Sequence, residues 1–511
     1  MNDLVVIRTE KKYFEKRCNL PESKIVNGLN NLGMPTEIEG EEYLIEVTPN
    51  RPDFYFVEGI IRTLDSYYRK ECMEYKKKKG EYKIKVDSSV KSVRPHISSC
   101  VIKGLKIDDK IFEEIIEMQE KLHDTLGRKR KKAAIGVHNL DVIEFPLEYK
   151  IVKEHSFVPL EYSNEMSIGE ILTKHPKGVG YAHLVEKGKY PLIVGRNGIV
   201  SFPPIINADR TKIDKNTKNL LIEATGMQKE TVEGIVSMFA CAFADLGAEI
   251  YSVNIEGEEH PELKYMKINV DEIKATKLLG KKINKKEFED SLGKMGYVNK
   301  GGKLYSQPYR MDLMDEVDIV EDVAIGIGYD NFVPTTPKLN TVGSLHKISE
   351  QEDEIREIMN GMGFLEITTF TLMEEGGKKV LNPKTEDCGA LRSNLFGSLL
   401  GVFKNNKMKG LPQMIYEVGD IYKEGVEKHL AVGIMSKNGD FNLIRAYAQR
   451  MMKEFGIKYE IKKNEKEGFE KGKCGVVYFK NKEIGVIGEL NKEKISKFEL
   501  ENRVVCFEIK I

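Results

Sequence analysis

The chain has 511 residues, of which 41% are hydrophobic and 31% are charged, and its 80 basic side chains balance 80 acidic ones. A chain of this length needs roughly three or four hydrophobic cores, so we expect a multidomain globular protein. No apolar run of about 18 residues and no signal-peptide core is present, which predicts a cytoplasmic protein without a membrane partner. The seven cysteines are scattered and never spaced as C-x-x-C, which argues against a disulfide framework or a zinc site.

Residues 1–75 are predicted to form a small α+β module. A strand over 43–47 leads into a turn that contains Arg51 and Asp53, and an amphipathic helix that carries Glu58 follows. The same order of strand, Arg-x-Asp and acidic helix returns later in the chain, which indicates an internal duplication.

Residues 85–255 are predicted to form a larger α/β domain. A helix over 111–122 leads to five consecutive basic residues, 128–132, and then to an apolar strand. The basic run is able to hold phosphates, but an exposed basic loop fits the sequence equally well, and a nuclear address is also open. An Asn-Gly turn predicts a β-hairpin, and a later strand carries Glu223 and Thr225 ahead of a long amphipathic helix.

Residues 263–337 are predicted to form a third small module. A strand over 265–270, two short helices near 271–279 and 285–294, and a second strand over 304–313 are expected in that order, which resembles the winged-helix-like modules of DNA-binding proteins. The segment 311–337 then holds seven acidic residues and no Lys or Arg. Such a segment is poorly suited to contact a phosphate backbone.

The acidic segment has a helical pattern. Apolar residues recur at intervals of three and four from Asp315 onward, which predicts one apolar stripe of a helix. Asp318, Glu321 and Asp322 are then expected together on the opposite face, and Asp312 at the preceding strand end is able to fold over them. Four oxygen ligands without His or Cys favour Mg²⁺. The alternative is that Asp315 caps the helix and that the helix dipole favours the acids near it.

Residues 345–511 alternate helices with strands that are expected to form an antiparallel sheet. A helix that is capped by Ser349 and runs to Met362, a strand over 365–372 and a helix over 395–403 come first. Four further strands are predicted over 414–418, 430–435, 476–479 and 484–487. The whole chain is therefore predicted to be an α+β multidomain protein with small winged-helix-like modules, an α/β domain and an antiparallel-sheet domain.

One motif in the third module resembles a known family. It runs from Arg310-x-Asp312 through Glu316-x-Asp318-x-x-Glu321-Asp322-Val323-Ala324 to Gly328-Tyr329-Asp330-Asn331. This run is similar to the signature of the β subunit of phenylalanyl-tRNA synthetase, archaeal and eukaryotic type, and the similarity extends in order over nearly the full chain. The acids that bind Mg²⁺ near the α-subunit interface in that family match Asp312, Asp318, Glu321 and Asp322.

The resemblance implies a heterotetramer of two α and two β subunits that attaches phenylalanine to its tRNA in an ATP-dependent reaction. ATP and phenylalanine are expected to bind through the α subunit. Residues 345–511 resemble a class II synthetase core, but the stretch 485–490 lacks the closing Arg with which such cores hold ATP. Without cations at the triphosphate the developing charge is not stabilised, so this domain is expected to be a catalytic-like scaffold.

Residues 85–255 resemble the editing domain of the same subunits. Tyrosine is phenylalanine plus one hydroxyl, which an apolar pocket rejects by only about a hundredfold, so a second site must read the hydroxyl. Glu223 and Thr225 near the end of one strand, with Ser201 on the facing hairpin, fit the roles of phenol acceptor and ester-side polar group. The family usually has Asp where this chain has Glu223, and often Thr where it has Met227. The alternative is that Glu223 and Thr225 are ordinary strand-end and cap residues.

Two other classes of function fit parts of the sequence. One is a stand-alone hydrolase that clears mischarged tRNA, and the other is a non-enzymatic nucleic-acid-binding protein that uses the two helix–strand modules. A stand-alone hydrolase has no need of a catalytic-like domain, and a DNA-binding protein is expected to be basic where this chain is acidic.

Overall fold

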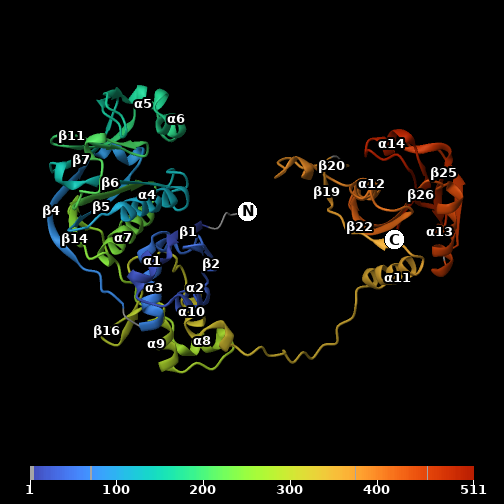
Figure 1. Ribbon diagram of the computed structural model, residues 1–511, viewed down its shortest axis with the longest axis horizontal. Coiled ribbons are helices and arrows are strands. Elements are labelled where there is room, and N and C mark those ends of the chain that lie inside the picture. Colours follow the sequence, from blue (N-terminus) through green and yellow to red (C-terminus); the bar gives the residue numbers. More distant parts are fainter. Residues whose placement is uncertain (1–4, 70–71, 375, 457) are drawn as a thin grey trace. The chain divides into compact units, whose positions relative to one another are not determined.

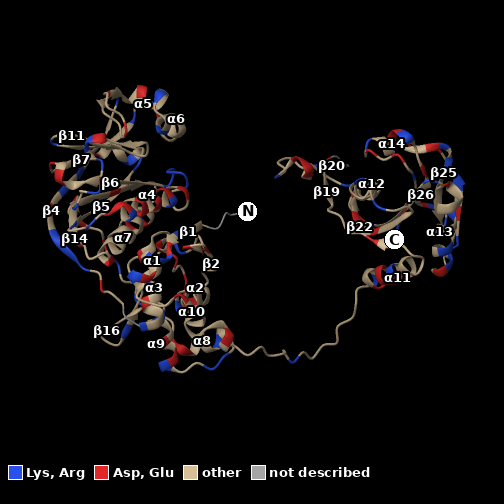
Figure 2. Ribbon diagram, in the orientation of Figure 1, with Lys and Arg blue, Asp and Glu red and all other residues tan. Residues whose placement is uncertain are grey.

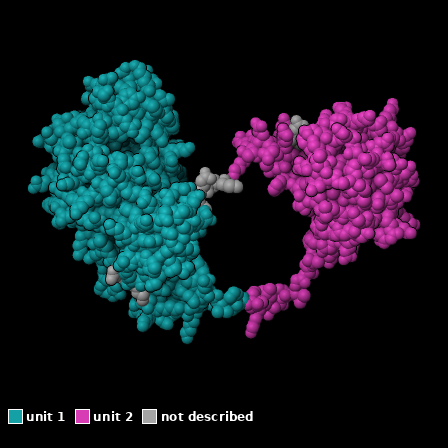
Figure 3. All heavy atoms as spheres, viewed as in Figure 1, with its two compact units in different colours: residues 1–335 teal, residues 336–511 magenta. Residues whose placement is uncertain are grey.

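The computed structural model describes residues 5–69, 72–374, 376–456 and 458–511 (Figure 1). The chain divides into two compact units, residues 1–335 and residues 336–511 (Figure 3). Both units combine helices with several sheets, which confirms the predicted α+β multidomain fold. In the described ranges, no helix is both long enough and apolar enough to cross a membrane.

The first module of unit 1 pairs a three-stranded antiparallel sheet, in the order β1-β3-β2, with three helices. Alternate residues of the middle strand, Tyr43, Ile45 and Val47, are fully buried, as the two-residue period of a strand requires. The elements are β1 (Val5–Glu10), α1 (Lys11–Cys18), α2 (Glu22–Asn31), β2 (Thr36–Glu39), β3 (Glu42–Val47) and α3 (Val57–Arg69).

The sheet domain of unit 1 is built on ten strands in the order β12-β11-β10-β7-β4-β14-β5-β13-β6, with β15 paired to β14. The sheet begins at residue 77 and ends at residue 260, beyond the predicted limits 85–255. Its strands are β4 (Lys77–Val86), β5 (His96–Lys103), β6 (Ala133–Asn139), β7 (Leu147–Val152), β10 (Tyr190–Gly195), β11 (Gly198–Phe202), β12 (Ile206–Asn207), β13 (Leu220–Gly226), β14 (Glu249–Ile255) and β15 (Glu258–His260). The hairpin β10–β11 confirms the prediction from the Asn-Gly turn.

The strand β13 occupies the centre of this domain. It pairs with β5 on one side and β6 on the other, and all seven of its residues are buried. Helix α7 (Lys229–Asp245) packs across β5 and β13, and α4 (Asp109–Asp124) shares the same hydrophobic core. The smaller helices α5 (Ile168–Lys174) and α6 (Pro176–Tyr181) lie farther from these two helices, near β11 (Figure 1).

The third module of unit 1 repeats the order of elements found in the first. Two helices, a short hairpin, an Arg-x-Asp sequence and a last helix follow one another in both, as the predicted duplication requires. The elements are α8 (Glu272–Leu279), α9 (Lys285–Lys294), β16 (Val298–Lys300), β17 (Lys303–Tyr305) and α10 (Glu316–Ile327). Helix α3 of the first module packs on α9 of the third, and both modules share one hydrophobic core with the sheet domain.

Two strand predictions for the third module were wrong. The strand expected over 265–270 is reduced to an isolated bridge between Lys267 and Tyr305. The strand expected over 304–313 ends at Tyr305, because Pro308 has no N–H to donate to a ladder.

Unit 2 is built on a seven-stranded sheet in the order β18-β22-β23-β27-β26-β25-β24, antiparallel except for the parallel pair β18–β22. Side chains of β27 alternate between two cores: Val505 and Phe507 face one, Val504 and Cys506 the other. The strands are β18 (Leu365–Glu366), β22 (Gln413–Tyr422), β23 (Val426–Ser436), β24 (Tyr459–Lys463), β25 (Phe469–Phe479), β26 (Lys482–Leu490) and β27 (Arg503–Lys510).

Helices cover both faces of this sheet. Residues of α11 (Lys347–Gly361) and α13 (Phe441–Glu454) belong to one core, and residues of α12 (Phe396–Asn405) and α14 (Lys492–Ser496) to the other. The predicted antiparallel sheet is confirmed. The predicted cap Ser349 was wrong: His346 caps α11, because its Nδ1 accepts from the Ile348 N–H at 3.3 Å. The strand expected over 365–372 is only the short β18 and the start of β19 (Leu372–Met373).

Candidate functional site

The carboxylate of Glu223 lies at the centre of the predicted editing site. The Ser201 hydroxyl donates to its Oε1 at 3.0 Å, and the His138 Nε2 lies 3.7 Å from the same oxygen. Its Oε2 is buried and has no hydrogen-bond partner among the described residues. Ser201 belongs to β11 and Glu223 to β13, which are far apart in the strand order, so the sheet curls to bring them together.

Two residues that the sequence did not single out complete this arrangement. Gly136 on β6 is paired with Glu223, and a Cβ there would lie 2.5 Å from Glu223 Oε1 and 2.4 Å from His138 Nε2. Only glycine therefore leaves room for the carboxylate. His138 is fully buried, and its Nδ1 lies 3.0 Å from the Thr211 hydroxyl. His138 could have been found from the sequence, because it is a titratable residue that directly follows the apolar residues 133–137.

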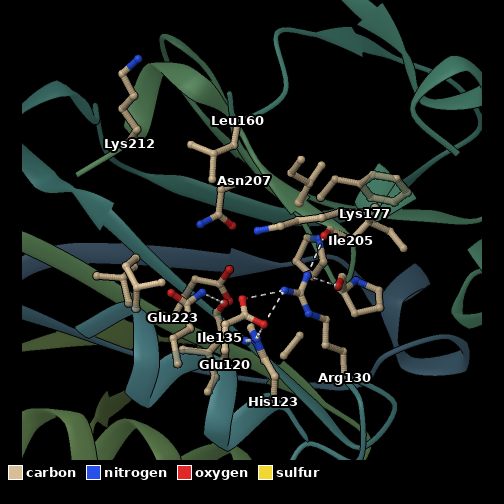
Figure 4. Close-up of a pocket in the computed structure, with 18 of the residues that line it drawn as sticks. Glu120, His123, Arg130, Ile135, Leu160, Lys177, Ile205, Asn207, Lys212 and Glu223 are labelled. Carbon is tan, nitrogen blue, oxygen red and sulfur yellow. Dashed lines mark hydrogen bonds and ion pairs between the residues drawn. The ribbon is translucent and has the colours of Figure 1, made fainter. Parts of the chain in front are cut away.

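A cavity of about 380 Å³ opens at Glu223, bounded by α4, β6 and the segment around β12 (Figure 4). Most of its wall is apolar, formed by Phe112, Ile116, Ala134, Ile135, Val137, Leu160, Phe202, Pro203, Pro204, Ile205, Ile206 and Ile213. Its polar lining consists of Gln119, Glu120, His123, Arg130, Glu161, Lys177, Asn207, Lys212 and Glu223. A chamber that is apolar over most of its wall and carries polar groups at defined positions is typical of a small-ligand site.

One wall of the cavity carries an ionic cluster. Arg130 donates to Glu120 at 3.1 Å and to the Ile205 carbonyl at 2.8 Å. The nearby His123 imidazole and then Arg130 lower the pKa of Glu120 to about 2, and burial lowers the pKa of His123. The Ile135 N–H donates to His123 Nε2 at 2.9 Å, so the neutral imidazole carries its proton on Nδ1.

Thr225 was expected beside the ester, but its side chain instead contacts Arg94. Arg94 donates from Nε to the Thr225 hydroxyl at 2.9 Å and from Nη2 to the Thr225 carbonyl at 2.7 Å. Burial lowers the pKa of Arg94 to about 10. Of the three residues predicted for the editing site, Glu223 lines the cavity, while the described cavity wall does not include Ser201 or Thr225.

The acidic helix α10 begins with a capping box. Asp315 is the N-cap residue, and the Asp318 carboxylate accepts from the Asp315 N–H at 2.8 Å and from the Met314 N–H at 2.6 Å. Lys274 forms an ion pair with Glu316. The first turn of α10 therefore has the capping arrangement that was the alternative to a metal site.

A buried arginine joins two of the predicted metal ligands. Arg310 donates from Nη2 to Asp312 and to Asp322, each at 2.7 Å, and the Tyr297 hydroxyl donates to Asp322 at 2.6 Å. Burial favours a lower pKa for Arg310, but the negative charges of Asp322 and Asp312 outweigh it and raise that pKa. The positive charge expected from a metal ion is supplied here by Arg310, one residue before the acidic segment begins.

The four predicted ligands are thus not gathered into one patch. Asp322 is buried at 4% exposure, Asp318 closes the capping box, and Glu321 is exposed. Among the residues that the structure describes, no group of three or more His, Cys, Asp or Glu side chains is arranged to hold a metal ion. In the described part of the chain, these carboxylates therefore do not form a metal cage by themselves.

The first module repeats the Arg-x-Asp geometry. Arg51 donates to both oxygens of Asp53 at 2.9 Å, as Arg310 does to Asp312. The acids on the two following helices differ in their surroundings: Glu58 of α3 is buried, with Arg17 at 2.6 Å, whereas Glu321 of α10 is exposed.

Unit 2 carries a cleft of about 630 Å³ that includes Gly485 and His429. His429 lies 2.9 Å from Glu508 and 3.2 Å from Glu427. The basic residues that line the cleft in the described chain are the four lysines Lys423, Lys466, Lys494 and Lys510 and this histidine. Lysine is a point charge without the bidentate fork of arginine.

Comparison with known proteins assigns the class. Residues 333–511 match the family model for the phenylalanyl tRNA synthetase beta chain CLM domain, and residues 266–329 match that for the tRNA synthetase B5 domain. The chain therefore contains two domains of the aminoacyl-tRNA synthetase class.

Relatives that match over nearly the whole chain show to which synthetase family it belongs. The phenylalanine–tRNA ligase beta subunit of Archaeoglobus fulgidus is 38% identical over 97% of this chain and 96% of its own length, and that of Methanocaldococcus jannaschii is 33% identical over 99% of both. An N-terminal fragment of the phenylalanyl-tRNA synthetase beta subunit from Pyrococcus horikoshii has a TM-score of 0.59 and 31% identity, covering 63% of this chain and 99% of the fragment. The chain belongs to the family of phenylalanine–tRNA ligase β subunits, as its motif predicted.

Proposed function

We propose that two copies of this chain assemble with two α subunits in the cytoplasm and attach phenylalanine to its tRNA in an ATP-dependent reaction, and that the Glu223 cavity hydrolyses tRNA mischarged with tyrosine. The observation that carries the editing part is Glu223 itself: the residue lines a largely apolar cavity, and its buried Oε2 has no hydrogen-bond partner among the described residues.

The cavity suits a tyrosyl group better than a phenylalanyl group. Its apolar walls receive the ring, and the carboxylate of Glu223 accepts a hydrogen bond from the phenol. A phenylalanyl group leaves the buried carboxylate without that bond, and sites built to bind a hydroxyl reject the analogue that lacks it by roughly 10⁴–10⁵-fold. Editing would therefore spare the correct product.

Ser201 and Thr225 act in this proposal by holding other residues of the site in place. The Ser201 hydroxyl donates to Glu223 Oε1, which leaves Oε2 for the substrate. Thr225 fixes Arg94, whose Nη2 also lies 3.3 Å from the Arg130 carbonyl, so it supports the wall on which Arg130 lies. Water is the second substrate of the hydrolysis.

Unit 2 acts as a scaffold in this proposal. Its cleft offers lysines where class II cores use arginines, so ATP and phenylalanine are bound by the α subunit. For the predicted Mg²⁺, the proposed ligands differ from the four carboxylates expected from the sequence. Exposed Glu321 is the acid placed to meet a cation, and the α subunit supplies the remaining ligands.

Reconstitution with an α subunit tests the whole proposal. The complex is expected to charge tRNA with phenylalanine and to deacylate Tyr-tRNA, whereas either subunit alone is expected not to charge. A stand-alone hydrolase would deacylate Tyr-tRNA equally well without α. Absence of both reactions in the complex would contradict the proposal.

A further inference from the structure

We infer that the turn after α4, residues 127–132, binds the phosphodiester backbone of the tRNA 3′ end while its aminoacyl ester enters the Glu223 cavity. This inference rests on the editing function proposed above and adds the surface that receives the RNA. Basic residues gather at this turn next to α4 (Figure 2). From the sequence alone, the basic residues 128–132 fitted a phosphate-binding site and an exposed loop equally well.

The turn has a fixed and unusual backbone. Arg128, Lys129 and Arg130 all have left-handed φ angles, of 47°, 52° and 66°. Non-glycine residues adopt this conformation rarely, and it persists where the surrounding structure holds it, often at functional sites. The Lys132 N–H closes the turn by donating to the Gly127 carbonyl at 2.7 Å. The basic residues are therefore presented on a hydrogen-bonded turn of defined backbone conformation.

Arg130 ties the turn to the cavity. Its guanidinium is buried in the cavity wall, where Glu120 and the Ile205 carbonyl hold it, and it stacks over the Tyr181 ring at 4.5 Å. The side chains beside it in the sequence, Arg128, Lys129 and Lys131, are exposed. One basic side chain therefore points inward to the cavity, and three lie outside it.

The charges inside and outside the cavity match the two ends of an aminoacylated RNA terminus. Among the charged residues that line the cavity, Arg130 is paired with Glu120 and Lys212 with Asp209. Glu161 and Glu223 favour the α-ammonium group of the ester over a phosphate. The exposed basic residues of the turn attract phosphates that remain outside. Lys177 reaches over the cavity from another side and adds a further cation (Figure 4).

The test removes the outer charges and leaves the cavity intact. In the assembled α/β enzyme, the triple variant Arg128→Gln/Lys129→Gln/Lys131→Gln is expected to raise KM for Tyr-tRNA deacylation about tenfold without changing kcat. Binding of a deacylation-resistant, amide-linked Tyr-tRNA should weaken, and the slope of its logarithmic affinity against logarithmic salt should fall by roughly 2. Arg128→Lys keeps the charge and should keep the wild-type KM.

A matched control removes three exposed lysines from unit 2, as Lys463→Gln/Lys471→Gln/Lys480→Gln, and is expected to leave KM and the salt slope unchanged. Hydrolysis of a tyrosyl ester of adenosine, which has no phosphodiester, should be equal in wild type and in the turn variant. Wild-type KM and salt slope in the turn variant would overturn the inference. If wild type itself does not deacylate Tyr-tRNA, the proposed function fails, and the amide-linked RNA still decides whether the turn binds.

Discussion

The guanidinium of Arg310 donates to the carboxylate of Asp322 at 2.7 Å, and both side chains are almost completely buried. Removal of one partner of such a pair leaves the other charge unpaired in the core, which costs roughly 3–5 kcal/mol. We therefore expect Arg310→Met to lower the free energy of unfolding of unit 1 by that amount, measured by urea denaturation. Lys274→Met, which breaks the half-exposed pair with Glu316, should cost at most about 1 kcal/mol. Equal losses would contradict the assigned role of Arg310.

Glu321 and Asp322 are adjacent but should behave differently. Glu321→Gln is expected to lower the magnesium content of the purified α/β complex and to weaken assembly, while the fold of the isolated chain is unchanged, because Glu321 is exposed. Asp322→Asn is expected to destabilise the isolated chain, because Arg310 loses its partner. Metal analysis and sedimentation measure the first effect, and denaturation the second. Equal metal occupancy and equal assembly in wild type and Glu321→Gln would remove Glu321 from a cation site.

The isolated chain is expected not to form phenylalanyl-adenylate. Its cleft in unit 2 has lysines and glutamates where a triphosphate would need bidentate arginines. Pyrophosphate exchange with phenylalanine and ATP measures this directly. Exchange by the β chain purified without α would show that unit 2 is a catalytic domain.

Glu114 gives the first unit a pH-dependent stability. Burial raises the pKa of Glu114 to about 7, so its ionisation is penalised in the folded state, and stability is lost as the pH rises from the unfolded pKa of 4.5 to about 7. Glu114→Gln removes this loss. We expect the variant to gain at most about 3 kcal/mol at pH 8 and distinctly less at pH 5. Glu113→Gln on the exposed face of the same helix is the control, and equal gains at both pH values would contradict the account.

The sequence predicted the elements with regular periodicity, and the family resemblance placed Glu223 and Ser201 at one site. In the structure the curled sheet brings these two residues into hydrogen-bond contact. Thr225 was expected at the ester because it follows Glu223 on the same face. Its partner Arg94 lies 131 residues away in the sequence, and no local pattern predicts such a contact.

The acidic helix shows why charge patterns alone were insufficient. Asp318, Glu321 and Asp322 do follow helical spacing, and a helical wheel therefore assigns all three to the solvent face. A helical wheel takes no account of a buried cation that draws Asp322 into the core. Arg310 is that cation, and it precedes the segment 311–337 over which charges were counted. The turn at residues 128–130 is a similar case, since its left-handed backbone is accompanied by hydrogen bonds that join Arg130 to Arg94 and Ile205, which are distant in the sequence.

The central claim is that Glu223 reads the tyrosine hydroxyl. Its most direct test is the rate of Tyr-tRNA deacylation by the α/β complex with Glu223→Ala. Loss of a hydrogen bond to a charged group, worth about 1.5–3 kcal/mol, predicts a rate roughly 10- to 100-fold lower. Phenylalanine charging should be unchanged, and Glu230→Ala, an exposed acid in the same domain, should match wild type in both reactions. Unchanged deacylation in Glu223→Ala would contradict the account.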